Sequence, residues 1–356
     1  MKPLAGKVAL VAGATRGAGR GIALSLAEAG AVVWCTGRST RADTGRAAGR
    51  GAPFVLEQRP ETIEETAELA LARGGEAVAV RVDHSDAEQV AALVARIRHE
   101  HGRIDVLVND IWGGDELVEH GAVYWQLSAD KGFALVERVL KTHFITTRAV
   151  VPLMVERSSG LVVEITDGHF QGYRGSLFYD LAKVIPLRLA LGLAADLVWQ
   201  RQQGITSLAL TPGFLRSEAV LELFGVSEQN WRDAVAKDRH FAESETPFYV
   251  GRAVAALAAD PNVAGKSGRA FASWELAEEY GFDDADGRRP HWGRYFDGVV
   301  ADILARGGPH DDDERMLVYA RYHQLALEPV PPAWHATAAQ RLGVVSGASS
   351  SAPYRT

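Results

Sequence analysis

The sequence contains one cysteine, Cys35, which lies inside an apolar segment. A single thiol cannot form an intramolecular disulfide, and it cannot supply the paired thiolates of a structural zinc site. The 11 histidines are scattered without HxxxH or HExxH spacing, so no metal site is expected. This composition favours the reducing environment of the cytoplasm.

Long apolar runs are also missing. No run approaches the ~18 apolar residues that a membrane-spanning helix requires. The N-terminal residues MKPLAGKVALVAG lead directly into a strand pattern and not into the apolar core of a signal peptide. We therefore expect a cytoplasmic protein without a membrane partner.

Positive charge is not in excess. The chain has 45 acidic and 38 basic residues, a net charge of −7, and its only dense run of one sign is the acidic segment 311–314. Backbone binding to nucleic acid requires clustered positive charge, so a nucleic-acid partner is not expected. A hydrophobic share of 47% in 356 residues is that of a globular protein with a sizeable core.

Short β-branched apolar runs alternate along the chain with stretches rich in Ala, Leu and Glu. Continuous hydrophobicity marks strands that are buried on both faces, and the alternation of strands with helices indicates a doubly wound parallel sheet of the α/β class. The expected strands are 7–12, 31–36, 77–83, 105–109, 161–166, 206–211 and, more weakly, 268–272. The expected helices include 19–29, 61–72, 87–99, 133–151 and 176–203.

Two segments are longer than ordinary connections. Residues 37–59 are rich in Gly, Arg and Ala and have no periodicity, and we expect a mobile loop close to a ligand. Residues 215–244 form an amphipathic insertion that contains Phe224, Trp231 and Phe241. A lid over a binding site and a packed pair of surface helices both fit this pattern.

The C-terminal part differs in character from the rest. After residue 287 the chain is polar with scattered aromatic side chains, among them Trp292 and Tyr295, and we expect an extension over 288–342. Residues 343–356 are of low complexity, which predicts a disordered tail. The single domain expected before the extension covers residues 1–287.

A glycine-rich turn follows the first expected strand, and a helix pattern follows the turn. Glycines at such a place permit a tight turn and a close approach of the backbone to a phosphate, which the N-terminus of the helix attracts. The turn therefore predicts a dinucleotide site that contains Gly13, Thr15, Arg16, Gly17, Ala18 and Gly19.

The end of the second expected strand indicates which dinucleotide binds. An acidic residue there would hydrogen-bond a ribose 2′-hydroxyl and select NAD. The strand instead ends in Thr36, Gly37 and Arg38, and Arg16 adds a second guanidinium. Two guanidiniums and no carboxylate favour a 2′-phosphate, so the expected cofactor is NADP(H).

Tyr179 and Lys183 are spaced i and i+4, and so they share one face of the helix expected from Ser176. A phenol with a pKa of ~10 is a poor acid–base catalyst near neutral pH unless a cation stabilises its phenolate. Lys183 can provide that cation and can also reach a cofactor ribose. Tyr179 would then protonate a developing alkoxide in reduction, or deprotonate an alcohol in oxidation.

Together these motifs resemble the short-chain dehydrogenase/reductase family, over residues from about 7 to about 281. The resemblance is carried by the GxxxGxG spacing at 13–19, Asp83, Asn109, the YxxxK pattern at 179–183 and the Pro-Gly motif at 212–217. A closer resemblance, to the branch around dehydrogenase/reductase family member 1 and its bacterial relatives, lies in segments 109–115, 245–247, 258–262 and 275–287.

The resemblance implies a Rossmann-type fold with seven parallel strands in the order 3-2-1-4-5-6-7. It also implies a homodimer or homotetramer packed through the helices at 133–151 and 176–203. The cofactor contacts that it implies are Asp83 at the adenine, Asn109 at the adenosine ribose or backbone, Ser217 near the phosphates, and Pro212, Gly213 and Leu215 at the carboxamide.

The chain departs from the family at the serine that normally hydrogen-bonds the reacting carbonyl. Asp167 falls in that position and Thr166 precedes it. Thr166 supplies the hydroxyl in one reading, Asp167 is kept neutral by burial in a second, and Asp167 faces a cationic substrate group such as an iminium in a third. An Asp167 that only caps a turn or pairs with Lys183 is also open. Val139 occupies the position of the asparagine that completes a proton relay in many relatives.

Five further residues are candidates for the substrate pocket, although aromatic side chains at such positions can equally be core. They are Trp112, His169, Tyr173, Phe214 and Trp231. The predicted function is an NADPH-dependent oxidoreductase that transfers a hydride to the carbonyl of a ketone or aldehyde, or to an imine, of a small organic substrate such as a secondary metabolite. A catalytically impaired NADP(H)-binding sensor or scaffold, and a lyase or epimerase of the same family, are the alternatives.

Overall fold

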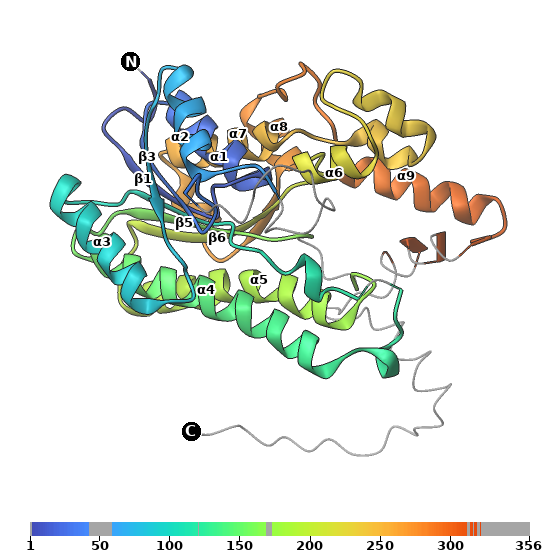
Figure 1. Cartoon of the computed structure of the whole chain (residues 1–356), viewed down its shortest axis with the longest axis horizontal. Coiled ribbons are helices and arrows are strands. Elements are labelled where there is room, and N and C mark those ends of the chain that lie inside the picture. The colour runs from blue at the N-terminus through green and yellow to red at the C-terminus, as the bar shows by residue number, and fades with distance from the viewer. Residues whose placement is uncertain are drawn as a thin grey trace.

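Seven parallel strands form one sheet in the computed structural model, in the order β3-β2-β1-β4-β5-β6-β7, which confirms the expected order (Figure 1). The structure describes residues 2–42, 59–119, 121–168, 173–311, 314–315, 317–318 and 321. The strands are β1 (Val8–Ala12), β2 (Val32–Gly37), β3 (Glu76–Arg81), β4 (Val106–Asn109), β5 (Gly160–Ile165), β6 (Ile205–Thr211) and β7 (Ala270–Ala272).

Helices cover both faces of this sheet (Figure 1). One face carries α1 (Gly17–Glu28), α2 (Ile63–Ala72) and α7 (Pro247–Ala259). The other face carries α3 (Ala87–His101), α4 (Ala129–Val155) and α5 (Leu177–Trp199). The described part of the chain also contains α8 (Ser273–Tyr280) and the short 3₁₀ helices η3 (Asp115–Leu117), η4 (Tyr124–Gln126) and η7 (Val263–Lys266).

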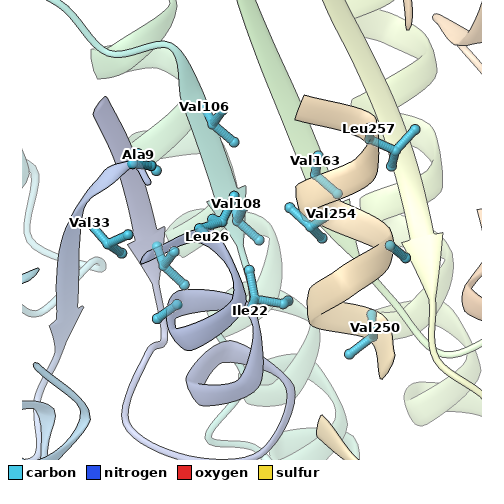
Figure 2. Close-up of a cluster of buried hydrophobic side chains, with 14 of the residues drawn as sticks. Ala9, Ile22, Leu26, Val33, Val106, Val108, Val163, Val250, Val254 and Leu257 are labelled. Carbon is cyan, nitrogen blue, oxygen red and sulfur yellow. The ribbon is translucent and has the colours of Figure 1, made fainter. Parts of the chain in front are cut away.

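Two apolar cores lie between these layers. Successive residues of a strand point to opposite faces, so Ala9 on β1 belongs to the core under α1 and α7, whereas Leu10 belongs to the core under α3, α4 and α5. Figure 2 shows the first core, where Ile22 of α1 and Val254 of α7 pack near Val108 of β4. Burial of strands on both faces explains their continuous hydrophobic runs.

Polar caps set the starts of several helices. Thr62 accepts a hydrogen bond from the Glu65 N–H at the start of α2, and the Asp86 carboxylate accepts from two N–H groups at the start of α3. Ser128 accepts from the Lys131 N–H, and α4 therefore begins four residues before the expected helix at 133–151.

The insertion at 215–244 forms α6 (Glu218–Leu223) and two 3₁₀ helices, η5 (Trp231–Ala236) and η6 (Arg239–Glu243). These elements enclose an apolar cluster of their own, made of Leu221, Trp231, Ala234 and Phe241. The fully buried Arg216 donates to Glu228 inside the insertion and to Asp286 beyond α8. The insertion is therefore packed against the segment that follows the sheet.

The expected C-terminal extension begins with a further helix, α9 (Trp292–Ala305). The expected tail at 343–356 and residues 43–58 of the expected loop lie outside the described residues. Among the helices of the described ranges, none is both long and apolar enough to cross a membrane.

Candidate active site

The glycine turn between β1 and α1 is packed directly on the end of β4. Gly13 has a φ of +94°, and a Cβ at this residue would lie 2.2 Å from the carbonyl oxygen of Asp110. Only glycine tolerates both the conformation and the contact. Thr15 and Ala18 are buried within the turn, and Gly19 is held just as closely, since a Cβ there would lie 2.2 Å from the Gly13 oxygen.

An anion occupies the N-terminus of α1 in this structure, and it is a carboxylate of the chain itself. Glu218 Oε2, from α6, accepts a hydrogen bond of 2.8 Å from the Gly17 N–H. Glu218 Oε1 also lies 3.7 Å from Arg20 Nη1. The turn therefore has a backbone donor that already binds a carboxylate, and the N-terminus of α1 adds a positive environment, so the residues present fit a dinucleotide phosphate.

The end of β2 differs in one respect from the sequence prediction. Arg38 is exposed, as a 2′-phosphate ligand would need to be. Arg16, however, donates to the buried Glu61 carboxylate at 3.2 Å and to Ser39 at 3.3 Å. The expectation that no carboxylate lies near these guanidiniums is wrong for Arg16, because the turn before α2 brings Glu61 back to it.

Asp83 and Asn109, which the resemblance implies as adenosine contacts, differ in their surroundings. Asp83 is half-buried at the end of the segment after β3, and its carboxylate accepts from the Ser85 N–H and hydroxyl. Burial raises the pKa of Asp83, but these bonds and the nearby Arg38 outweigh it, so the pKa lies below its usual value. Asp83 therefore stays ionised next to the exposed Arg38.

The Asn109 side chain is fully buried at the end of β4. Its amide nitrogen donates to Glu164 Oε1 and to Thr147 Oγ1, each at 2.8 Å. The other Glu164 oxygen lies 2.6 Å from Nδ1 of the buried His143. The amide is part of an internal polar network, so a side-chain contact with the ribose does not fit this structure, and the alternative contact through the backbone stays a prediction.

Tyr179 and Lys183 lie on α5, one turn apart, next to Trp112 from the segment after β4. The Lys183 Nζ is 3.6 Å from the centre of the Trp112 ring and 5.4 Å from that of the Tyr179 ring. The two rings meet edge to face at 5.7 Å, and Trp112 Nε1 donates to Asp115. Burial lowers the pKa of Lys183 although three carboxylates oppose this shift.

Asp167 is a direct partner of Tyr179. The Tyr179 hydroxyl donates to Asp167 Oδ2 at 2.5 Å, and an Arg174 N–H donates to Asp167 Oδ1. Burial favours a raised pKa for Asp167, but the charge of Arg174 and these hydrogen bonds lower it to about 2. Burial and the Asp167 charge raise the pKa of Tyr179 well above 10. The expectation that Lys183 lowers the pKa of Tyr179 is therefore wrong for this structure, in which Tyr179 is protonated and Asp167 is ionised.

Two readings of the missing serine are corrected by this geometry. Thr166 is only 4% exposed, and its hydroxyl donates at 2.5 Å to the backbone carbonyl of Lys183, so it serves the backbone and not a substrate. A neutral Asp167 is also wrong, since Arg174 keeps the carboxylate ionised. Val139 is buried against Leu135 and Ala182.

The end of β6 closes the site on its other side. The Gly168 N–H donates to Thr211 Oγ1 at 2.8 Å, which ties the segment of Asp167 to β6. Pro212 and Gly213 follow, and the Gly213 N–H donates to the buried Glu245 carboxyl at 2.8 Å. Leu215 forms an isolated parallel β-bridge with Glu245, and the Ser217 side chain caps the N-terminus of α6.

The candidates for the substrate pocket have different positions. Tyr173 and Phe214 are partly exposed, whereas His169 lies outside the described residues. Trp231 is 3% exposed inside the cluster of the insertion, so its assignment to the pocket is wrong. Phe214 instead contacts His240 and Trp292, with ring centres 6.4 and 5.8 Å away.

Sequence reasoning missed Arg174, Glu218 and Trp292 as neighbours of the site. The aromatic character of Trp292 was visible, but its position against Gly213 follows from the path of the chain after α8. No local pattern distinguishes Arg174 or Glu218 from a solvated surface charge.

Comparisons with known proteins agree with this architecture. A family model described as enoyl-(acyl carrier protein) reductase matches residues 44–266. Dehydrogenase/reductase SDR family member 1 of Mus musculus is 32% identical over 80% of this chain and 85% of its own length. A 3-oxoacyl-[acyl-carrier-protein] reductase of Synechocystis sp. is 28% identical over 76% of this chain and 96% of its own.

Among solved structures, a variant of actinorhodin polyketide ketoreductase crystallised with NADPH superposes with a TM-score of 0.57 and 26% identity. The match covers 75% of this chain and 95% of that one. The family-model match and the identity to the mouse relative, over the same seven-stranded sheet, show that this chain belongs to the short-chain dehydrogenase/reductase family.

Proposed function

We propose that this chain is an NADP(H)-dependent reductase of carbonyl groups in small organic molecules, with Tyr179 as the general acid. The observation that carries this proposal is the pair of Tyr179 and Lys183 on one face of α5, at the edge of the sheet where the glycine turn binds an anion. When bound there, a nicotinamide dinucleotide supplies the hydride.

Tyr179 is protonated in this structure, which is the form that reduction requires. Its hydroxyl can pass a proton to the oxygen that becomes negative as the carbonyl is reduced. Lys183 lies behind the Tyr179 ring, and its positive charge favours the phenolate that remains. Trp112 covers the Lys183 ammonium and limits the access of water to it.

The choice of NADP(H) rests on the basic residues around the end of β2. Arg38 is exposed beside Asp83, and Arg16 lies at the glycine turn with Glu61 as its partner. A 2′-phosphate can engage Arg38 directly and share Arg16 with Glu61. The ketoreductase that superposes on this chain was crystallised with NADPH, which supports the same choice.

Aromatic side chains suggest the kind of substrate. Trp112, Tyr173 and Phe214 are partly exposed near the ends of β4, β5 and β6, and such a rim suits an apolar or aromatic molecule. We infer a ketone or aldehyde of this kind, such as a secondary metabolite, and an imine as the second candidate.

A homodimer or homotetramer is part of the proposal. Exposed apolar side chains follow the outer faces of α4 and α5, which lie side by side below the sheet in Figure 1. They are Phe133, Leu140, Phe144 and Val155 on α4, and Leu181, Leu191, Val198 and Trp199 on α5. Large apolar side chains exposed on two neighbouring helices are typical of a protein interface. The expected compartment is the cytoplasm, with no nucleic-acid or membrane partner.

The first experiment measures cofactor binding and turnover together. NADPH and NADH are titrated by fluorescence, and ketones, aldehydes and cyclic imines are then added while the NADPH absorbance is followed. We expect tighter binding of NADPH than of NADH and stoichiometric NADPH consumption with a carbonyl compound. Tyr179→Phe should bind NADPH with unchanged affinity and lose about 10²–10⁴-fold in rate. The exposed Tyr124 provides the matched control Tyr124→Phe.

The other outcomes separate the alternatives. Tight NADPH binding with no turnover of any compound would favour a sensor or scaffold. Product formation without net NADPH consumption would favour a lyase or epimerase. If neither dinucleotide bound, the proposal would be abandoned.

A further inference from the structure

Asp167 creates an electrostatic difficulty for carbonyl reduction. A hydroxyl at this position would donate a hydrogen bond to the substrate oxygen, but an ionised carboxylate has no proton to donate. It would also repel the negative charge that develops on that oxygen. A carbonyl reductase with Asp167 at this place therefore needs another donor close to Tyr179.

Arg174 has the position and the free capacity to be that donor. Its guanidinium donates to Asp167 Oδ1 and lies over the bare Gly168, where Nη1 would be 3.3 Å from a Cβ. The Arg174 side chain is 29% exposed. A guanidinium has five N–H donors, and among the described residues the Arg174 side chain donates to Asp167 alone.

The backbone also fixes Arg174 with respect to Tyr179. The Arg174 N–H donates at 3.0 Å to Asp180, the residue that follows Tyr179 on the first turn of α5. Asp167 thus accepts from Tyr179 with one oxygen and from Arg174 with the other. The carboxylate holds a neutral acid and a charged donor side by side.

The charges indicate which substrate fits. Asp167 is already paired with a cation, so a positively charged iminium would have to compete with Arg174 for it. An oxygen that gains negative charge would instead meet the guanidinium and the Tyr179 hydroxyl together. The paired arrangement favours an oxyanion over a cation.

We propose that Arg174 is a catalytic hydrogen-bond donor to the substrate oxygen, positioned by Asp167, and that it makes the site selective for carbonyl compounds over iminium ions. This inference rests on the proposed function.

In the step that it describes, a bound dihydronicotinamide would supply a hydride with its electron pair to the carbonyl carbon, and it would be oxidised as the carbonyl is reduced. The π pair of the C=O bond moves to the oxygen, which Arg174 stabilises. Tyr179 gives its proton to this oxygen to complete the alcohol, and it regains a proton from water.

The test compares Arg174→Gln and Arg174→Lys with the wild type, using 4-nitrobenzaldehyde as the carbonyl probe and 3,4-dihydroisoquinoline as the imine probe. For Arg174→Gln we expect a loss of about 100-fold in kcat with the aldehyde, as for the removal of an oxyanion donor, and unchanged NADPH affinity. Arg174→Lys should recover part of that rate. Imine reduction should fall much less or rise.

Chemical rescue separates a catalytic from a structural role. In Arg174→Ala, added guanidinium at millimolar concentration should restore part of the aldehyde rate, which a misfolded site would not do. Arg188→Gln, at an exposed arginine on α5, is the control. An aldehyde rate at the wild-type level in Arg174→Gln, or equal losses with both probes and no rescue, would overturn the proposal. So would a wild type that reduces only the imine.

A binding measurement keeps the inference separate from the proposed function. The non-reducible anion 4-nitrobenzoate is titrated into the NADP⁺ complex, and its affinity should fall at least tenfold in Arg174→Gln. An equal affinity in both proteins, or no binding to the wild type, would count against Arg174 even if the enzyme turned over. Failure of the proposed function would show instead as NADPH binding without consumption of any compound.

Discussion

The protonation state of the buried Glu245 carboxyl depends on its surroundings. One oxygen accepts from the Gly213 N–H and the Ser273 hydroxyl, while the other, Oε1, is buried with no hydrogen-bond partner in the described part of the chain. Burial outweighs these bonds and raises the pKa of Glu245 to about 8. A protonated carboxyl is the form that such a site tolerates, because an unpaired buried charge is costly.

This pKa predicts a stability that depends on pH. Glu245 has an ordinary pKa of 4.5 when unfolded, so the folded state retains the proton between pH 4.5 and about 8. Its contribution to stability is complete below pH 4.5 and is lost as the pH rises through 8. Glu245→Gln stays neutral, so from pH 5 to 8 the wild type should lose stability relative to it, by on the order of 1 kcal/mol per pH unit.

Urea unfolding of both proteins at several pH values measures this difference. Glu137→Gln, at an exposed position, should follow the wild type throughout. Parallel curves for the wild type and Glu245→Gln would show that Glu245 is ionised in the folded protein.

At the scale of the elements, α6 links the insertion to the cofactor turn. Glu218 of α6 bonds the Gly17 N–H, and Glu222, one turn later, pairs with Arg59. Glu218 thus contacts the glycine turn directly, whereas Glu222 contacts Arg59. A phosphate that binds the turn has to displace Glu218, so cofactor binding and the position of α6 are coupled.

Removal of the Glu218 charge should therefore tighten cofactor binding. We expect Glu218→Gln to lower the Kd for NADPH about 3–10-fold, because a charged acceptor that competes with the phosphate becomes a neutral one. Fluorescence titration measures the change. Glu222→Gln is the matched control on the same helix, since its partner is Arg59 and not the turn. Weaker NADPH binding in Glu218→Gln would mean that Glu218 supports the cofactor.

The elements themselves were largely predictable, and the contacts between them were not. All seven strands lie within a few residues of the expected places. Burial on both faces demands continuous apolar runs in β1, β4, β5 and β6, whereas the edge strand β3 is only partly buried. The helix ends differ by a few residues where a cap such as Ser128 decides them. The prediction that Trp231 lines the substrate pocket was wrong, because an aromatic residue in an amphipathic segment can face either its own apolar cluster or a ligand.

At the scale of the molecule, the outer faces of α4 and α5 determine the expected assembly. Phe144 is 53% exposed and lies near the middle of α4, between the exposed Leu140 and Val155. We expect Phe144→Asp to shift the protein from an oligomer toward the monomer, because a charge at the centre of an apolar interface is desolvated without a partner. Sedimentation velocity measures the shift.

Leu71 provides the control for this experiment. It is 54% exposed on α2, which covers the opposite face of the sheet, so Leu71→Asp should leave the assembly unchanged. A wild type that sediments as a monomer would exclude the proposed homo-oligomer.

The order of strands and helices, the glycine turn and the spacing of Tyr179 and Lys183 could be predicted from the sequence, because burial, turn geometry and the helical repeat act over a few neighbouring residues. Only the tertiary structure decided that Thr166 serves the backbone, that Asp167 holds Tyr179 and Arg174, and that Glu61 reaches Arg16. Glu218 meets Gly17 across 201 residues of sequence. Such contacts depend on how separate segments pack at one edge of the sheet, and no local pattern encodes them.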